Sequence, residues 1–561
     1  MASHFSIRCL DCGTQTSYDA RKPQCPNCGG MWSEAIYDYA KLSKNFMTSL
    51  AGRPADIWRY RELLPIQEPN LDLSLGEGGT PLIRATNLGM MLGCQAIFVK
   101  DERQGPTASF KDRQAAVTIA ALKEAGISEM VVASTGNVAI SYSAYAARAG
   151  IKLWAFLTSL VPAAKMREVA LYGTQVIKIT GSYDQAKLVA AEFAKSRRLY
   201  LDLGARSIPC VEGMKTLAYE ISEQLTALMG PPDNDTESAT VPWRVPDWYI
   251  QSVSGGLGPY GILKGFKELE LLNLTDRIPK FAMVQAEGCA PMVHAWKQNK
   301  DTAQPVQSPN TLIHTLATGD PGRTYTLLRE QLQNASGGIF ESITDEEAFR
   351  AMHFTAKMEG LSVEPAAAVA FAGVVKLLRA GQIKPSDVIV INCTGHTTPI
   401  ERNIIGEGWA HKIVMPSEAM EESSEEGLLA ALSKVGTDRF PRIAIVDDNA
   451  DVRRLIRRIL QSQGNYTLFE AINGKEAVEL ARKELPDLMI LDLMMPEMDG
   501  FSVMDALQTN PATAQIPIIV VTAKELTPAE KSRLKGHIQS LMQKGDFMSD
   551  ELQDEVRALL G

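Results

Sequence analysis

Short apolar runs alternate with helix-like stretches over most of this chain, and this alternation restricts the possible folds more than any other feature. The runs are rich in β-branched residues; examples are MVVAS (130–134), WYIQSV (248–253) and VIVIN (388–392). Continuous apolar strands that alternate with amphipathic helices predict parallel sheets covered by helices. We therefore predict an α/β protein.

An acidic segment separates two regions of this kind. Residues 36–412 form the first region and residues 441–561 the second, and between them residues 413–440 include SEAMEESSEEG, which has five Glu and no Lys or Arg. A run of like charges is typical of a solvated linker. With a cysteine-rich segment over residues 1–35, the chain is predicted to have four parts.

Charge and composition exclude several classes of protein. The chain has 57 basic and 66 acidic residues, a formal net charge of −9, which argues against a protein that coats nucleic acid or an anionic membrane. The sequence has no uninterrupted apolar run of about 18 residues, the length that would predict a membrane span. The first residues, MASHFSIRCLDCG, lack the apolar core of a secretion signal. We expect a cytoplasmic protein with no membrane or nucleic-acid partner.

Four of the eight cysteines lie near the N-terminus in two Cys-x-x-Cys pairs, namely Cys9, Cys12, Cys25 and Cys28. Such pairs, each followed by glycine, can bring four thiolates into the tetrahedron that Zn²⁺ prefers. A redox pair or a disulfide clasp is the alternative, and a reducing compartment disfavours it. The spacing predicts a structural zinc ribbon.

One lysine of the central region occupies a position where its amine can become a nucleophile. Lys111 follows a Pro-Thr turn near the predicted start of a helix. Burial at such a place lowers the pKa of a lysine amine, which then becomes a nucleophile toward an aldehyde. The alternative is a surface helix lysine that pairs with Asp112 or another neighbour, and this segment alone favours that alternative.

Two loops of the central region suit anionic groups. Residues 134–137 (STGN) follow a strand and open a helix whose free N–H groups suit a carboxylate, although an ordinary helix cap is the alternative. Residues 254–258 (SGGLG) follow another strand, and their backbone amides can surround a phosphate. A tight turn explains a glycine-rich loop nearly as often.

Taken together, these segments resemble the fold type II pyridoxal-phosphate enzymes, and within them the threonine synthases. The motifs that carry the resemblance are, in chain order, GEGGTPL (76–82), SFKDR (109–113), STGN (134–137), VPAAK (161–165), EGMKT (212–216), QAEG (285–288), VEPA (363–366) and TGH (394–396). Some members of the family also carry an N-terminal four-cysteine ribbon. The resemblance implies two α/β/α subdomains and a homodimer.

The resemblance also implies a role for individual residues. Lys111 would form the Schiff base with pyridoxal phosphate and move protons at the substrate carbons, Asn137 would bond the ring hydroxyl, and Thr394 would face the pyridine nitrogen. A hydroxyl at that nitrogen suits elimination and replacement better than transamination. The remaining implied contacts are those of the substrate carboxylate with Ser134, Thr135 and Gly136, and those of the cofactor phosphate with Ser254, Gly255, Gly256, Leu257 and Gly258. Lys100 and Lys215 are interpreted as structural, and Lys165 as structural or as a phosphate contact.

The implied function is that of a lyase that converts O-phospho-L-homoserine and water to threonine and phosphate. Departures from the family's pattern concern the substrate, because Cys210 stands where an arginine usually helps to hold the phosphate. A thiol cannot replace that cation. Two alternatives stay open: an enzyme of the serine or threonine ammonia-lyase type that eliminates or replaces at the β carbon, and a catalytically idle scaffold that acts in signalling.

Acidic residues follow the predicted strands of the last region. Asp447 and Asp448 follow one strand, Asp492 ends the next, and Thr522 ends a third. The carboxyl ends of parallel strands line one crevice, so these side chains should converge, and clustered carboxylates need a cation such as Mg²⁺. Asp492 can then attack a phosphoryl donor, while Thr522 and Lys544 hold the phosphoryl oxygens. The alternative is an Asp-Asp pair that only starts a loop.

This last region resembles a response-regulator receiver domain. The motifs are VDDN (446–449), LDLMMPEMDG (491–500) and VTAK (521–524), together with Lys544. The resemblance implies a doubly wound, flavodoxin-like domain that a histidine kinase or a phosphotransfer protein phosphorylates on Asp492. Leu541 stands where an aromatic switch residue is usual. We expect an enzyme whose activity or assembly is linked to a phosphorelay.

Overall fold

The computed structural model describes residues 4–134, 136–158, 161, 163–179, 183–232, 241–396, 441–461, 466–524, 526–534, 536–543 and 549–560. The chain divides into two compact units. The first contains residues 1–85, 96–352 and 362–399, and the second contains residues 86–95, 353–361 and 400–561. The predicted linker, residues 413–440, lies outside the described residues, and the four predicted segment boundaries remain predictions.

The first unit contains two sheets that are built mainly from parallel strands. Six strands have the order β12-β11-β10-β13-β5-β4, in which only β4 is antiparallel to its neighbour, and four parallel strands have the order β8-β7-β6-β9. The strands are β4 (Leu82–Arg84), β5 (Ala96–Asp101), β6 (Glu129–Ser134), β7 (Lys152–Thr158), β8 (Gln175–Ile179), β9 (Tyr200–Leu201), β10 (Trp248–Ser252), β11 (Lys280–Ala286), β12 (Gly338–Ile343) and β13 (Val388–Cys393).

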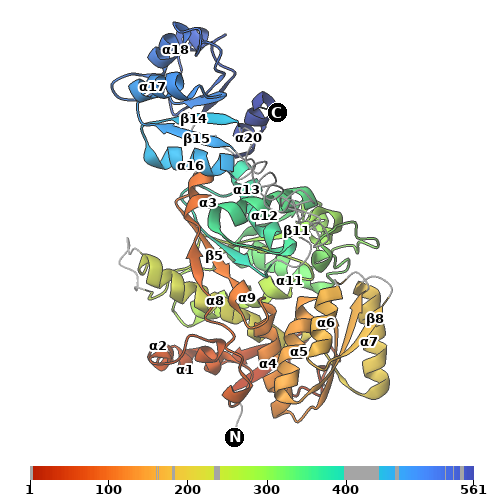
Figure 1. Ribbon diagram of the computed structural model, residues 1–561. Helices are drawn as coiled ribbons and strands as arrows, with labels where there is room; N and C mark the ends of the chain where they lie inside the picture. Colours follow the sequence, from red (N-terminus) through yellow and green to blue (C-terminus); the bar gives the residue numbers. More distant parts are fainter. Residues whose placement is uncertain are drawn as a thin grey trace, which may run out of the picture. The chain divides into compact units, whose positions relative to one another are not determined.

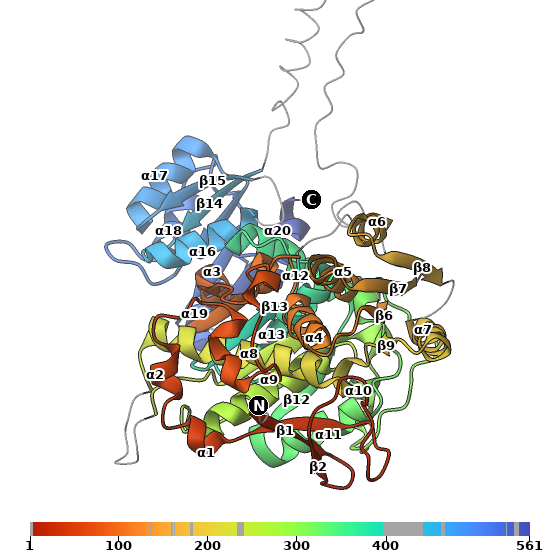
Figure 2. The same cartoon turned by 90° about the horizontal axis from the view of Figure 1, so that it is seen from below.

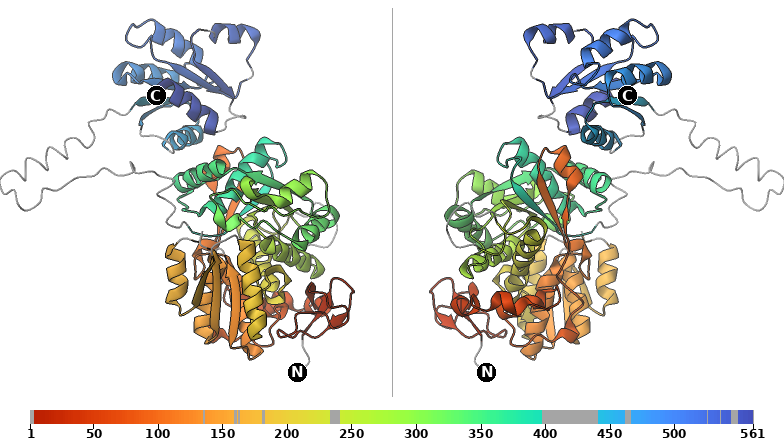
Figure 3. Two further views of the ribbon diagram at one scale, coloured as in Figure 1. Left: turned by 90° about the vertical axis from the view of Figure 1, so that its right-hand side faces the viewer. Right: turned by 90° about the vertical axis from the view of Figure 1, so that its left-hand side faces the viewer.

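Helices cover both faces of these sheets, which explains why the strands are apolar throughout (Figures 1 and 3). In the four-stranded sheet, Met130 and Val132 pack with α4 and α5, whereas Val131 between them packs with α7 on the opposite face. The longer helices of the unit are α4 (Lys111–Glu124), α5 (Asn137–Ala149), α6 (Ala163–Leu171), α7 (Tyr183–Arg197), α8 (Ile208–Met229), α9 (Leu257–Leu271), α10 (Pro291–Lys297), α11 (Arg323–Gln331) and α13 (Pro365–Arg379). Helix α12 (Asp345–Glu359) spans residues of both units.

The N-terminal segment forms a small antiparallel sheet of order β2-β1-β3 (Figure 2). Its strands are β1 (Phe5–Cys9), β2 (Gln15–Thr16) and β3 (Ser33–Tyr37). Phe5 and Tyr37 are buried in the same hydrophobic core as α8 and α9, so this ribbon is packed onto the first unit. Short helices α1 (Tyr39–Leu42) and α2 (Phe46–Leu50) follow it.

The second unit contains a five-stranded parallel sheet of order β15-β14-β16-β17-β18. Its strands are β14 (Arg442–Val446), β15 (Thr467–Ala471), β16 (Leu488–Leu491), β17 (Ile518–Thr522) and β18 (Ser540–Gln543), and its helices are α3 (Thr86–Met91), α16 (Ala450–Gln461), α17 (Gly474–Glu484), α18 (Gly500–Gln508), α19 (Pro528–Leu534) and α20 (Ser549–Leu560). Alternate strand residues pack with α17 and α18 on one face and with α16 and α20 on the other. The predicted α/β architecture is confirmed, and so is the predicted doubly wound sheet of the second unit. No helix among the described residues is both long enough and apolar enough to span a membrane.

Candidate active site and phosphorylation site

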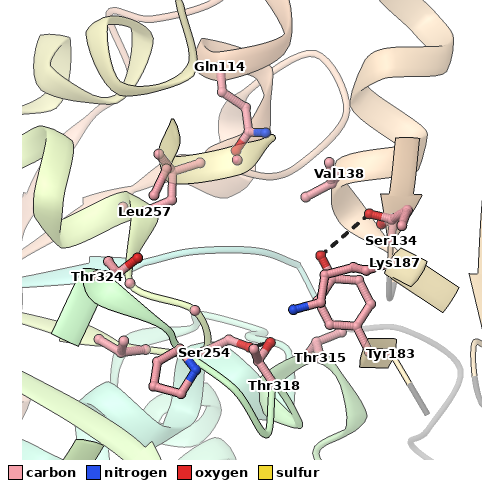
Figure 4. A pocket seen from close by; sticks show the side chains of 18 of the residues that line it. Gln114, Ser134, Val138, Tyr183, Lys187, Ser254, Leu257, Thr315, Thr318 and Thr324 are labelled. Carbon is pink, nitrogen blue, oxygen red and sulfur yellow. Dashed lines mark hydrogen bonds between the residues drawn. The ribbon is translucent and has the colours of Figure 1, made fainter. Parts of the chain in front are cut away.

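A cavity of about 690 Å³ lies in the first unit, where loops from both of its large sheets meet. Figure 4 shows side chains that face this space from two sides, with Ser134, Val138 and Lys187 on one side and Ser254, Leu257 and Thr324 on the other. The residues predicted from the sequence that line it are Lys111, Ser134, Asn137, Ser254, Gly255, Gly256, Leu257, Gly258 and Thr394. Thr135 lies outside the described residues. The fold therefore brings the predicted cofactor residues to one cavity.

Lys111 is the first residue of α4 and belongs to the cavity wall. Its Nζ lies 4.3 Å from the centroid of the Phe110 ring, and burial lowers the pKa of its amine to about 8. The neighbouring Asp112 instead accepts a hydrogen bond from the backbone N–H of Thr107, at 2.9 Å. The interpretation of Lys111 as an exposed lysine paired with Asp112 therefore does not describe this structure.

Backbone hydrogen bonds fix Lys111 relative to two other segments of the cavity wall. The N–H of Phe110 donates to the carbonyl of Thr394, at 3.2 Å, and the N–H of Glu364 donates to the carbonyl of Gly395, at 3.2 Å. Thr394 is buried directly after β13, and Glu364 directly precedes α13. Backbone hydrogen bonds thus join three motifs that are far apart in the sequence at one side of the site.

Asn137 is held by two charged neighbours. Its Nδ2 donates to Oε1 of Glu364, at 2.9 Å, and its Oδ1 accepts a hydrogen bond from Nζ of Lys165. Nζ of Lys165 also lies 3.5 Å from Glu364, and both side chains are buried. Glu364 was not predicted as a site residue, although the VEPA motif pointed to its segment. Lys165 therefore contacts the predicted cofactor residue Asn137, and its role is not only structural.

The other two lysines considered from the sequence belong to buried ion pairs. Nζ of Lys100 lies 2.7 Å from Glu220, and Nζ of Lys215 lies 2.8 Å from Glu268. Both amines are fully buried and neither residue lines the cavity, in agreement with a structural role.

In the first of the two predicted anion-binding loops, the side chain of Ser134 is already hydrogen-bonded to the backbone. Oγ of Ser134 accepts hydrogen bonds from the N–H groups of Gly136, at 3.0 Å, and Ala139, at 3.1 Å, which is the helix-capping arrangement. Gly136 itself has φ +144, a conformation that disfavours a side chain. The role of these residues toward a substrate carboxylate remains a prediction.

The glycine loop of residues 254–258 packs closely against its neighbours at the start of α9. Gly256 has φ +91, and a Cβ there would lie 2.6 Å from Thr324. A Cβ on Gly258 would lie 2.4 Å from Gln251, so side chains are excluded at both positions. The loop ends at the N-terminus of α9, where free N–H groups favour an anion, and Ser254 Oγ is hydrogen-bonded to Thr318 Oγ1. These residues fit the phosphate of pyridoxal phosphate.

Cys210 lies in a buried polar cluster next to the cavity. Its thiol donates to Oδ1 of Asp202, at 3.2 Å, and Sγ lies 3.2 Å from the hydroxyl of Tyr142. Burial raises the pKa of the Cys210 thiol, and burial also raises the pKa of the Asp202 carboxyl. Asp202 also lines the cavity, and no motif in the sequence pointed to it. This position offers an uncharged thiol and a carboxyl group where the family usually has a cation.

Three carboxylates converge in the second unit. Asp447 and Asp448 follow β14, Asp492 follows β16, and their ligand oxygens all lie within 4.8 Å of one another. Asp492 Oδ1 accepts a hydrogen bond from the N–H of Met494, at 3.1 Å. Thr522 is buried at the end of β17, the strand next to β16, and Lys544 lies outside the described residues. The oxygen cluster fits a Mg²⁺ ion.

The four N-terminal cysteines also form one cluster. Sγ of Cys9 lies 3.6 Å from Sγ of Cys28, Sγ of Cys12 lies 3.7 Å from Sγ of Cys25, and no disulfide joins these four cysteines. Four sulfurs at about 2.3 Å from a central Zn²⁺ would lie about 3.8 Å apart. The cluster therefore fits a tetrahedral zinc ion better than a disulfide clasp.

Comparison with known proteins agrees with this site. The family described as "Pyridoxal-phosphate dependent enzyme" matches residues 73–395. The chain belongs to this family. The response regulator receiver domain family matches residues 443–557. Threonine synthase of Methanocaldococcus jannaschii is 36% identical over 69% of this chain and 91% of its own length, and threonine synthase of Methanosarcina acetivorans is 32% identical over 72% and 94%. The predictions of a pyridoxal-phosphate-dependent lyase and of a receiver domain are confirmed.

Proposed function

We propose that this chain uses pyridoxal phosphate to convert O-phospho-L-homoserine and water to threonine and phosphate. One observation carries the proposal: Lys111, Asn137, Thr394 and the loop of residues 254–258 line a single cavity. The similarity to two threonine synthases over nine-tenths of their length supports the same reaction.

Each of these residues has a distinct task in such a reaction. Bound pyridoxal phosphate supplies an electron sink that makes protons on the neighbouring substrate carbons acidic. Lys111 holds the cofactor, and its amine, with a pKa of about 8, takes and returns these protons near neutral pH. Thr394 places a hydroxyl rather than a carboxylate at the pyridine nitrogen, which favours elimination and replacement over transamination.

The remaining residues hold the two molecules in place. Asn137 bonds the ring hydroxyl of the cofactor, and the loop of residues 254–258 holds the cofactor phosphate through backbone N–H groups at the start of α9. Ser134, Thr135 and Gly136 form the loop that holds the substrate carboxylate. This last assignment involves backbone groups of the loop, because Ser134 Oγ already caps α5.

A second candidate is elimination or replacement at the β carbon of serine or threonine. The hydrogen bond between Cys210 and Asp202 favours it, because this pair offers no cation for a substrate phosphate. The third alternative, an idle scaffold, gives no physical reason for a desolvated lysine beside Asn137 and Thr394.

Product analysis separates the three candidates. The cofactor-loaded chain is incubated with O-phospho-L-homoserine, L-serine or L-threonine, with Lys111→Ala as the inactive reference. Threonine and phosphate in equal amounts from the first substrate support our proposal. Ammonia and a keto acid from serine or threonine, without phosphate release, support the second candidate, and no product from any of them supports the scaffold.

For the second unit we propose phosphorylation of Asp492. Asp447, Asp448 and Asp492 would hold Mg²⁺, which would offset the negative charge of the phosphoryl group. Asp492 would attack the phosphorus of a phosphohistidine on a histidine kinase or phosphotransfer protein, the P–N bond would break and release the histidine, and Thr522 and Lys544 would hold the transferred oxygens. The added negative charge would change the turnover or the homodimer of the first unit.

For the ribbon we propose one bound zinc ion. Metal analysis of wild type and Cys25→Ser would test it, with Cys94→Ser as a control.

A further inference from the structure

The N-terminal ribbon extends to the wall of the substrate cavity. Trp32, which lies between the last cysteine pair and β3, lines the cavity together with Arg323 and Thr324 of α11. The guanidinium carbon of Arg323 lies 5.9 Å from the Trp32 ring centroid. Figure 2 shows the ribbon strands β1 and β2 on the side of the unit where α11 lies. Two residues of the cavity wall thus meet at the ribbon.

Arg323 is held from inside the cysteine cluster. Asp11 stands between Cys9 and Cys12, and its carboxylate forms an ion pair with the guanidinium of Arg323. A Cβ on Gly30 would lie 2.2 Å from Oδ2 of Asp11, so the second cysteine loop closes around the same carboxylate. The position of Arg323 therefore depends on the conformation of both cysteine loops.

The ribbon is also fixed to the helices behind the cavity. The hydroxyl of Tyr37 in β3 donates to Oε2 of Glu212 in α8, at 2.8 Å, and Nζ of Lys264 in α9 donates to the carbonyl of Ala35, at 2.8 Å. Helix α9 starts at the glycine loop of residues 254–258. One helix thus carries both the phosphate loop and an anchor of the ribbon.

Among the residues that the structure describes, the basic side chains that line this cavity are Lys111, Lys187, Arg206 and Arg323, and Lys111 is assigned to the cofactor. Cys210 supplies no cation. Lys187, like Arg323, is paired with a carboxylate, but its partner Asp184 lies on the same helix, at 2.5 Å. Arg206 lines the cavity but is exposed. Arg323 is half-buried and at the start of α11, where backbone N–H groups add to its charge. Asp11 is also partly exposed. The ion pair therefore orients the guanidinium of Arg323 and leaves part of it exposed.

We infer that the ribbon is part of the substrate site. Arg323 binds an anionic group of the amino-acid substrate, and Asp11 is the positioning residue that holds Arg323 at the cavity. The two cysteine loops therefore affect substrate affinity and not only the stability of the N-terminal segment. The substrate part of this inference rests on the proposed function.

Hydrogen–deuterium exchange of the full chain tests the positioning step without any substrate. Asp11→Asn removes the charge and keeps the shape, and Glu34→Gln, which breaks the ribbon's ion pair with Arg8, is the matched control. We expect faster exchange at residues 322–328 in Asp11→Asn and no change there in Glu34→Gln. Exchange that changes only within residues 5–37, or equally in both variants, would overturn the inference.

Affinity for amino acids tests the substrate step. In the cofactor-loaded protein, we expect Asp11→Asn and Arg323→Gln to raise KM by about tenfold with kcat nearly unchanged, and Glu34→Gln to behave as wild type. A rise with O-phospho-L-homoserine but not with L-serine identifies the phosphate as the bound group, whereas a rise with both identifies the α-carboxylate. Equal KM values in all variants would overturn the inference. A wild type without turnover on any substrate refutes the proposed function and, with it, the substrate step, whereas the exchange experiment still decides the positioning step.

Discussion

At the scale of single residues, burial gives Lys111 its chemistry. Its amine has a pKa of about 8, lowered by burial from 10.5. Because the folded chain binds this proton less tightly than the unfolded chain, the destabilisation is complete below about pH 8 and is lost as the pH rises toward 10.5. Above pH 8 the folded protein therefore holds a neutral, nucleophilic amine.

This shift predicts the pH dependence of cofactor uptake by the apoprotein. Only a neutral amine attacks the aldehyde, so the rate of uptake should rise with pH to a plateau, with a midpoint near pH 8. The growth of cofactor absorbance after mixing, recorded at a series of pH values, measures it. A rate that keeps rising to pH 10 would show that Lys111 is not desolvated.

Asp492 is the second residue on which a reaction depends. We predict that Asp492→Asn accepts no phosphoryl group from acetyl phosphate, because an amide lacks the nucleophilic oxygen, and that removal of Mg²⁺ has the same effect on wild type. Intact-protein mass spectrometry checks this. Asp505→Asn, an exposed change on α18, is the control and should be phosphorylated normally. Incorporation in Asp492→Asn would place the reaction on another residue.

At the scale of elements, close helix packing supports the cavity from behind. Helices α8 and α9 meet at Gly265, where a Cβ would lie 2.4 Å from the carbonyl oxygen of Lys215. We predict that Gly265→Ala destabilises the protein by roughly 1–3 kcal/mol, since the clash with backbone exceeds the gain of about 1 kcal/mol in helix propensity. Denaturant unfolding measures it, with the exposed Leu271→Ala within about 0.5 kcal/mol of wild type as control. Equal stability of Gly265→Ala and wild type would contradict this packing.

The sequence predicted those parts of the site that follow directly from parallel strands. Thr394 follows β13 and the loop of residues 254–258 follows β10, its neighbour in one sheet, whereas Asp447 and Asp492 follow β14 and β16, neighbours in another. Since the ends of neighbouring parallel strands meet at one edge, convergence within each sheet could be predicted. Asn137 follows β6 in a third sheet, so its approach to Thr394 could be expected only from the family resemblance. Trp32 and Arg323 could not be predicted, because loops without any periodic pattern bring them together. Asp202 follows the two-residue strand β9, which is too short to give a signal.

At the scale of the whole molecule, an enzyme and a receiver domain share one chain. We predict that phosphorylation of Asp492 changes either turnover or the oligomeric state, because the new charge alters the surface of the receiver domain. Turnover and sedimentation are compared before and after acetyl phosphate, with Asp492→Asn as the control that should not respond. If both quantities stay the same in phosphorylated wild type, the coupling is refuted.

The most direct test of the central claim is an absorbance spectrum of the purified, cofactor-loaded chain before and after addition of O-phospho-L-homoserine, with released phosphate measured in the same cuvette. Our account predicts a band of bound cofactor that shifts on addition, together with phosphate and threonine in excess of the enzyme. A band that does not shift with O-phospho-L-homoserine but does shift with serine or threonine would contradict the proposed substrate. The absence of any cofactor band in a chain with intact Lys111 would contradict the account of the site itself.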